Sequence, residues 1–97
     1  MPIVELSHSA KADLKQIHSY IAEDSLDAAD RLANEFSAKF RILADNPSAG
    51  RLRLDLGFSY RSFPYRRYVI FYVANEGGIE VRRVLHSAQD VESHFEM

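Results

Sequence analysis

Apolar residues recur every three or four positions through the first half of the chain, which is the spacing of one face of an α-helix. An alternating run over residues 2–6 predicts a first strand, and Ser7 is expected to cap the helix that follows. Ser25 is expected to cap a second helix, and Asn46-Pro47 ends it because the residue before a proline is disfavoured in helix. Two helices joined so tightly predict an antiparallel hairpin with both apolar stripes facing one sheet. The stripes are Leu14, Ile17, His18 and Ile21, then Ala29, Leu32, Ala33, Phe36, Phe40 and Leu43.

Beyond the loop at residues 46–50 the pattern changes to the two-residue period of β-strands. The segment Glu76-Gly77-Gly78 supplies the positive φ that a tight hairpin needs. A short helix is expected in the tail from Ser87, which begins like a capping box. The order β-α-α-β-β-β predicts a single α+β domain over residues 1–97, with the helix hairpin on one face of a mostly antiparallel sheet. Alternation over residues 51–56 predicts a strand, and residues 59–63 alternate less cleanly. The strongest strand prediction is residues 68–74, and a return strand is predicted over residues 79–85.

Strict alternation along the last two strands predicts which side chains share a face of the sheet. One face is expected to receive the helices, and the other is expected to be richer in tyrosine and arginine. In the first of these strands the two sets are Val69, Phe71 and Val73 against Tyr68, Ile70 and Tyr72. In the second strand they are Ile79, Val81, Arg83 and Leu85 against Glu80, Arg82 and Val84.

Charge is distributed unevenly along the chain. Residues 1–50 carry five lysines and arginines against eight acids, whereas residues 51–83 carry seven arginines against three acids. This asymmetry suggests an anionic partner for the basic half, although mixed surface charge on a small domain explains it equally well. The absence of cysteine excludes a disulfide scaffold and a thiolate zinc site. No export signal or membrane-length apolar run is present, so a cytoplasmic location without a membrane partner is expected.

Candidate chemistry is sparse. The sequence contains no phosphate-binding loop and no HExxH motif, so neither a cofactor nor a metal is expected. His18 lies on an apolar stripe and is expected to be packed. His86 can act as an acid or base near neutral pH, and Arg61, Arg67 and Arg83 can bind phosphate. A metal-independent ribonuclease needs a second titrating group, and none is obvious, so the set is incomplete. Tyrosines and arginines in SYRSFPYRRYVIFY also fit nucleic-acid binding, or simply strand formation with solvated ends.

Several long stretches resemble the RelE/ParE superfamily of bacterial toxins. They are ELSHSAKADLKQIHSYIA, AADRLANEF, NPSAGRLR, YRSFPYRRYVIFYV and IEVRRVLHSAQD. RelE-like members cut messenger RNA on the ribosome with a strand arginine and a C-terminal histidine or tyrosine. Here Tyr68 stands at the arginine position and Ser87 at the tyrosine position, which weakens that reading. The chain resembles the ParE branch more closely, and this implies a non-enzymatic inhibitor of DNA gyrase, neutralised by a ParD-type antitoxin.

The resemblance also implies where the partners bind. Tyr20 and Ile42 lie off the helix stripes and are candidates for the antitoxin surface, although partial burial at the helix edges explains them equally well. Operator DNA is expected to be contacted only through the antitoxin. Two alternatives remain: a ribosome-dependent endoribonuclease that uses His86, Arg61 and Arg83, and a module that binds DNA directly. The surface expected to bind the target consists of Tyr60, Arg61, Arg67, Tyr68, Arg83 and His86.

Charge reversal at Arg67 or Arg83 is expected to abolish toxicity while the fold is kept, because solvated strand-end charges contribute little to stability. The alternative is that Arg83 is structural and pairs with an acid from the helix layer.

Overall fold

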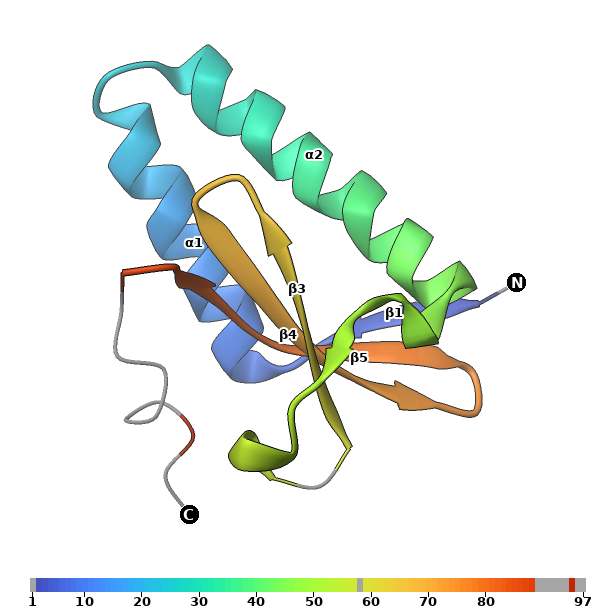
Figure 1. The fold of residues 1–97 in the computed structure, drawn as a ribbon. Coiled ribbons are helices and arrows are strands. Elements are labelled where there is room, and N and C mark those ends of the chain that lie inside the picture. Colours follow the sequence, from blue (N-terminus) through green and yellow to red (C-terminus); the bar gives the residue numbers. More distant parts are fainter. Residues whose placement is uncertain (1, 58, 89–94, 96–97) are drawn as a thin grey trace.

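The computed structural model describes residues 2–57, 59–88 and 95 (Figure 1). The chain begins with strand β1 (Ile3–Leu6), followed by helices α1 (His8–Ala22) and α2 (Leu26–Asp45). Four further strands follow: β2 (Arg51–Leu52), β3 (Tyr60–Tyr65), β4 (Tyr68–Asn75) and β5 (Gly78–His86). Two short 3-10 helices lie between α2 and β3, η1 (Pro47–Ala49) and η2 (Leu54–Leu56). The predicted sequence of a strand, two helices and then further strands is confirmed, with four strands after α2 where the predicted order β-α-α-β-β-β has three.

Both helices begin where the sequence predicts. The Ser7 side chain accepts a hydrogen bond from the Ala10 amide at 3.0 Å, and the Ser25 side chain accepts one from the Ala28 amide at 3.1 Å. The Ser7 hydroxyl also donates to the carbonyl of Arg82 at 2.8 Å, so the start of α1 is attached to β5. These caps satisfy backbone amides that have no partner within the helix.

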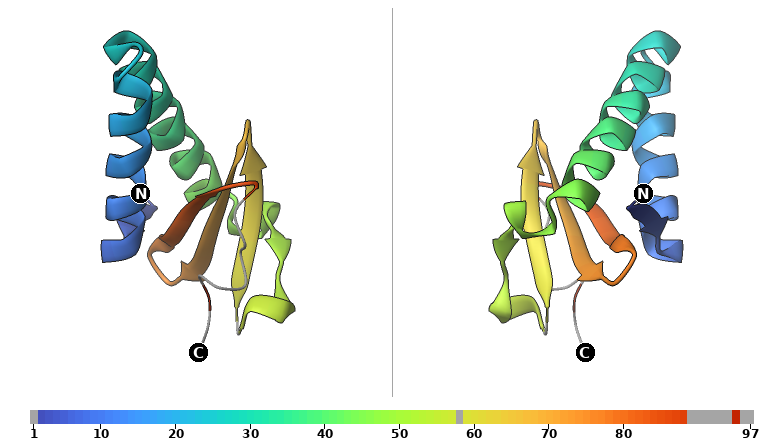
Figure 2. Two further views of the ribbon diagram at one scale, coloured as in Figure 1. Left: turned by 90° about the vertical axis from the view of Figure 1, so that its left-hand side faces the viewer. Right: turned by 90° about the vertical axis from the view of Figure 1, so that its right-hand side faces the viewer.

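The strands form one mixed sheet in the order β1-β5-β4-β3-β2. β1 runs parallel to β5, and every other neighbouring pair is antiparallel. Both helices lie on the same side of this sheet, as Figure 2 shows in two side views. The main core therefore lies between the helix hairpin and the strands, where Phe36, Leu43, Ile70, Tyr72 and Val81 are buried.

The predicted strand over residues 51–56 is wrong beyond Leu52. Arg53 and Asp55 pair through two hydrogen bonds of 3.0 and 2.7 Å, and the chain turns into η2. This turn carries Leu56 onto the face of the sheet away from the helices, where it is 5% exposed. Burial of a leucine there replaces the continued strand pairing that alternation predicted.

The hairpin between β4 and β5 has the predicted tight turn at Glu76 and Gly77. Gly78 has φ +152°, and a Cβ atom added to it would lie 2.0 Å from the carbonyl oxygen of Ile3. The close approach of β1 to β5 therefore requires glycine at this position. The predicted C-terminal helix falls mainly on residues 89–94, outside the described residues. In the described part of the chain no helix is long and apolar enough to cross a membrane.

Candidate target-binding surface

A buried carboxylate on α1 is hydrogen-bonded to both a side chain and the backbone of β5. The side chain of Asp13 accepts hydrogen bonds from Arg83 Nε at 2.8 Å, from Arg83 Nη2 at 2.9 Å and from the Val84 amide at 3.0 Å. Hydrogen bonding to Asp13 raises the pKa of Arg83. The expectation that Arg83 is a solvated strand-end charge is therefore wrong, and the alternative that it pairs with an acid of the helix layer is confirmed.

This ion pair lies at a β-bulge. Phe71 pairs with Arg83 while Tyr72 pairs with Val81, so Arg82 is the extra residue of β5. A bulge reverses the alternation of side chains beyond it. Val84 consequently joins the core under the helices together with Val81, while Leu85 joins a second cluster on the opposite face. The prediction that Val81, Arg83 and Leu85 share one face is wrong for this reason.

The bulge also determines the position of His86. This residue pairs in register with Tyr68, and their ring centroids lie 5.6 Å apart in an edge-on arrangement. Tyr68 packs in turn against Phe36 of α2 at 5.6 Å, so both rings belong to the helix side of the sheet. Burial raises the pKa of Tyr68, and the electrostatic effect of the nearby Tyr20 raises it further. The positive charge of Arg67 acts in the opposite direction and lowers this pKa. His86 Nδ1 accepts a hydrogen bond from the Ala88 amide at 3.1 Å.

Arg67 lies in the turn between β3 and β4, next to Tyr68. Its side chain is exposed, and its carbonyl accepts a hydrogen bond from the Ser87 amide at 2.8 Å. The structure thus brings Arg67, Tyr68 and His86 together at one end of the sheet. These three residues are the part of the predicted target surface that forms a single patch.

Tyr60 and Arg61 lie elsewhere, at the opposite end of β3. Arg61 Nη1 donates to the carbonyl of Gly50 at 2.8 Å, which attaches the edge of the sheet to the loop before β2. The ring of Tyr60 packs on Phe95 at 5.0 Å, and the guanidinium of Arg82 lies 5.8 Å from its centre.

The face of the sheet away from the helices is not the open tyrosine and arginine surface that alternation predicted. Tyr68 and Tyr72 lie under the helices, and Tyr72 donates its hydroxyl to the Pro47 carbonyl at 2.7 Å. The opposite face instead holds a small apolar cluster in which Phe71 is fully buried and Phe95 contributes a ring.

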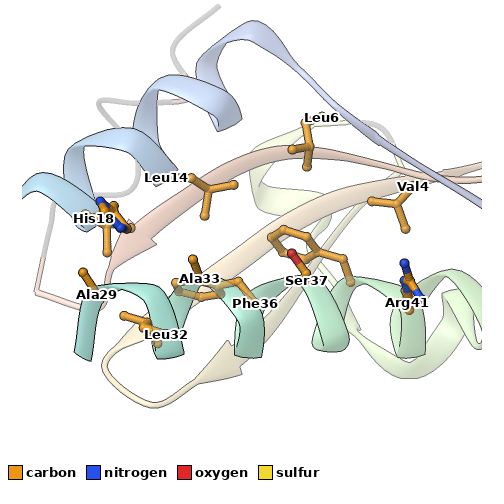
Figure 3. Close-up of a pocket in the computed structure, with 12 residues that line it drawn as sticks. Val4, Leu6, Leu14, His18, Ala29, Leu32, Ala33, Phe36, Ser37 and Arg41 are labelled. Atoms are coloured by element: carbon orange, nitrogen blue, oxygen red, sulfur yellow. The ribbon is translucent and has the colours of Figure 1, made fainter. Parts of the chain in front are cut away.

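A groove that periodicity did not predict lies between the two helices and β1 (Figure 3). Its volume is about 300 Å³ and its walls are mostly aliphatic. Polar atoms enter it at His18, Ser37 and Arg41; His18 is half-buried, and its Nε2 lies 2.8 Å from Asp30 Oδ1. The sequence feature that could have indicated this groove is the large number of small apolar residues on α2. The apolar lining comprises Val4, Leu6, Leu14, Ile17, Ala29, Leu32, Ala33, Phe36 and Phe40.

The two residues predicted to bind an antitoxin are both exposed, Tyr20 at 73% and Ile42 at 49%. Neither lines the groove. Among the described residues, no three histidine, aspartate or glutamate side chains are grouped so as to hold a metal ion.

Comparisons with known proteins agree on one family. A family model described as the ParE toxin of the type II toxin–antitoxin system parDE matches residues 4–91. Proteins named Toxin ParE1 from two strains of Mycobacterium tuberculosis are 33% identical over 92 residues, which cover 93% of this chain and 94% of each relative. A chain from the chromosomal ParDE toxin–antitoxin system of P. aeruginosa shares the fold, with a TM-score of 0.71 at 18% identity over 89% of this chain and 96% of that one. The chain therefore belongs to the ParE toxin family of type II toxin–antitoxin systems.

Proposed function

We propose that this toxin inhibits DNA gyrase in the cytoplasm and that a ParD-type antitoxin neutralises it. Membership of the ParE family supports the proposal, since gyrase is the target that the resemblance implies. Gyrase-dependent DNA breaks would then stall replication. The toxin would act through binding, without a chemical step of its own.

The observation that carries this proposal is the dispersal of the residues a ribonuclease would need. Arg83 is bound to Asp13, and Arg61 is bound to the Gly50 carbonyl. His86 lies opposite Tyr68 and Arg61 lies opposite Tyr72, four residues apart along β4. Four residues of strand correspond to about 13 Å, too far for one phosphate to be held by both side chains.

The patch of Arg67, Tyr68 and His86 is the proposed contact with the target. Arg67 supplies an exposed charge, and the two rings supply a surface that is largely fixed by packing on Phe36. Aromatic and arginine side chains of this kind carry much of the binding energy at protein interfaces. Tyr60, at the opposite end of β3, is proposed only as an additional contact with the target.

The groove between the helices and β1 is the proposed site for the antitoxin. An aliphatic groove with polar atoms at His18 and Arg41 suits the apolar face of an amphipathic helix. The relative from the ParDE system of P. aeruginosa supports a two-component system of this kind. Tyr20 and Ile42 would extend the contact outside the groove. Operator DNA would be reached through the antitoxin.

Expression of the toxin without antitoxin tests the target. We expect gyrase-linked DNA breaks and induction of the SOS response, both relieved by co-expression of the cognate antitoxin. Arg67→Glu should abolish the breaks while the protein remains folded, and Arg51→Glu on the exposed edge strand serves as the control. Codon-dependent messenger cleavage that His86→Ala abolishes, without DNA breaks, would refute the proposal and support the ribonuclease.

A further inference from the structure

Cations from both halves of the chain meet on one side of α2. Arg31, Glu35 and Lys39 are spaced four residues apart and therefore share one stripe of the helix. The turn between β3 and β4 lies beside this stripe and adds Arg66 and Arg67. We call Arg31, Lys39, Arg66 and Arg67 the basic ridge. Charge counted along the sequence missed it, because two of its members come from the acidic half.

Glu35 joins the helix to the turn. Its carboxylate accepts hydrogen bonds from the Tyr65 hydroxyl at 2.5 Å and from Arg66 Nε and Nη2 at 2.8 and 3.3 Å. Lys39 Nζ lies 5.1 Å from the centre of the Tyr65 ring, and the Arg66 guanidinium lies 5.6 Å from it. Two cations thus lie over the Tyr65 ring, and each is attracted by the negative face of the ring.

The backbone of the turn is held in an unusual conformation. Arg66 has φ +55°, which costs free energy for a residue other than glycine. The side chain of Arg66 is held by Glu35 on one side, and the carbonyl of Arg67 is held by the Ser87 amide on the other. Because the turn is attached on both sides, Arg67 projects from a rigid base and little order must be gained on binding.

The ridge is strongly positive in a chain whose net charge is −2. Its four cations outnumber the two acids of the same helix stripe, Asp27 and Glu35. Hydrogen bonds from Tyr65 and Arg66, followed by the charges of Arg66 and Arg31, lower the pKa of Glu35. Arg31 and Lys39 are eight residues apart, about 12 Å along the helix, a length that spans several phosphates of a DNA strand. Lys39 Nζ also lies 5.9 Å from the centre of the Phe63 ring, so the charge of Lys39 is held over two rings at the edge of the ridge.

We propose that the basic ridge binds the phosphate backbone of duplex DNA. The inference rests on the proposed function in one respect, since the DNA would be the segment engaged by gyrase. The ridge adjoins the patch of Arg67, Tyr68 and His86, and Arg67 belongs to both. One toxin could therefore touch the enzyme and its DNA together.

Fluorescence anisotropy with a labelled duplex of about 20 base pairs, in a series of salt concentrations, tests the ridge. The ridge variant is Arg31→Gln, Lys39→Gln and Arg67→Gln, which leaves the contact between Glu35 and Arg66 intact. The control variant is Lys11→Gln, Lys15→Gln and Arg51→Gln, three exposed cations away from the ridge. Both variants lose the same charge, and circular dichroism checks that both remain folded.

We expect wild-type toxin to bind DNA with a steep salt dependence, and the ridge variant to bind at least about ten-fold more weakly, with a salt slope lower by about one for each cation removed. The control variant should bind like wild type. Absence of binding at low salt, or equal losses in both variants, would overturn the proposal. An acidic peptide serves as a second probe. A ridge variant that loses binding to this peptide while its DNA binding is unchanged would also overturn the proposal.

The gyrase break experiment is scored separately, on wild-type toxin and on the double variant Arg31→Gln, Lys39→Gln, which keeps Arg67 of the proposed contact with gyrase. If wild-type toxin binds DNA through the ridge and produces no gyrase-linked breaks, the ridge stands and gyrase inhibition falls. If this double variant binds DNA more weakly and still produces breaks like wild type, gyrase inhibition stands and the role of the ridge at gyrase-bound DNA falls.

Discussion

The carboxylate of Asp13 accepts hydrogen bonds from Nε and Nη2 of Arg83 at 2.8 and 2.9 Å, although Arg83 lies seventy residues later in the chain. Asp13 is only 9% exposed, and its carboxylate accepts a third hydrogen bond from the backbone amide of Val84. The ion pair lies next to the bulge, beyond which His86 pairs with Tyr68.

Removal of the carboxylate should destabilise the protein strongly, because an arginine would remain half-buried without its partner. We expect Asp13→Asn to lower the free energy of unfolding by about 2–4 kcal/mol. Urea denaturation measures the change. Asp30→Asn, which alters an exposed carboxylate, should have a much smaller effect. The double variant Asp13→Asn, Arg83→Gln should recover part of the loss, and a double variant as unstable as the sum would contradict this account.

The junction of β1 and β5 depends on a single glycine. Gly78→Ala would put a Cβ atom 2.0 Å from the Ile3 carbonyl oxygen, so the parallel pair must separate. We expect a loss of at least about 2 kcal/mol and faster hydrogen exchange of the β1 amides. Gly77→Ala is the matched control, since its nearest neighbours would be 3.9 and 4.0 Å away. Equal exchange in the two variants would show that the close approach does not matter.

Acidification should loosen the contact between α2 and the β3–β4 turn. The hydrogen bond from Tyr65, followed by that from Arg66, lowers the pKa of Glu35 below its ordinary value of 4.5. Because the folded pKa is the lower one, the stability contributed by this contact is present above pH 4.5 and is lost as the pH falls through the folded value. Urea midpoints measured across this acidic range should therefore fall less steeply in Glu35→Gln than in wild type. Asp55, whose pKa is lowered by Arg53, titrates in both proteins and contributes equally to both pH dependences. Urea midpoints that fall equally steeply in the two proteins would therefore show that Glu35 does not contribute.

The groove can be tested with a matched pair of alanines on α2. Ala33 lines the groove, whereas Ala38 lies outside it, and both alanines are exposed. Ala33→Glu would bring a charge into the aliphatic walls, and we expect antitoxin binding to weaken about 100-fold. Isothermal titration calorimetry with the purified antitoxin measures this. Ala38→Glu should bind normally, and normal binding by Ala33→Glu would exclude the groove as the antitoxin site.

Local chemistry was enough to predict both helices and the order of a strand, two helices and further strands, but not the end of β2 at Leu52. Ser7 and Ser25 cap helices because their side chains reach amides three residues later, and Asn46-Pro47 ends α2 for a reason contained in the dipeptide. The turn at Glu76-Gly77 is likewise local. Such features depend on neighbours in sequence, so the pattern of residues alone determined them.

Only the tertiary structure decided the surfaces. The bulge at Arg82 lies next to the contact of Asp13 with β5, and alternation along a strand could not anticipate a reversal at a contact between residues seventy positions apart. The groove needs two helices and β1 at once, and the basic ridge needs α2 beside the β3–β4 turn. The sequence by itself determined the elements and the resemblance to a toxin superfamily, whereas long-range packing decided which charges remain exposed to meet a partner.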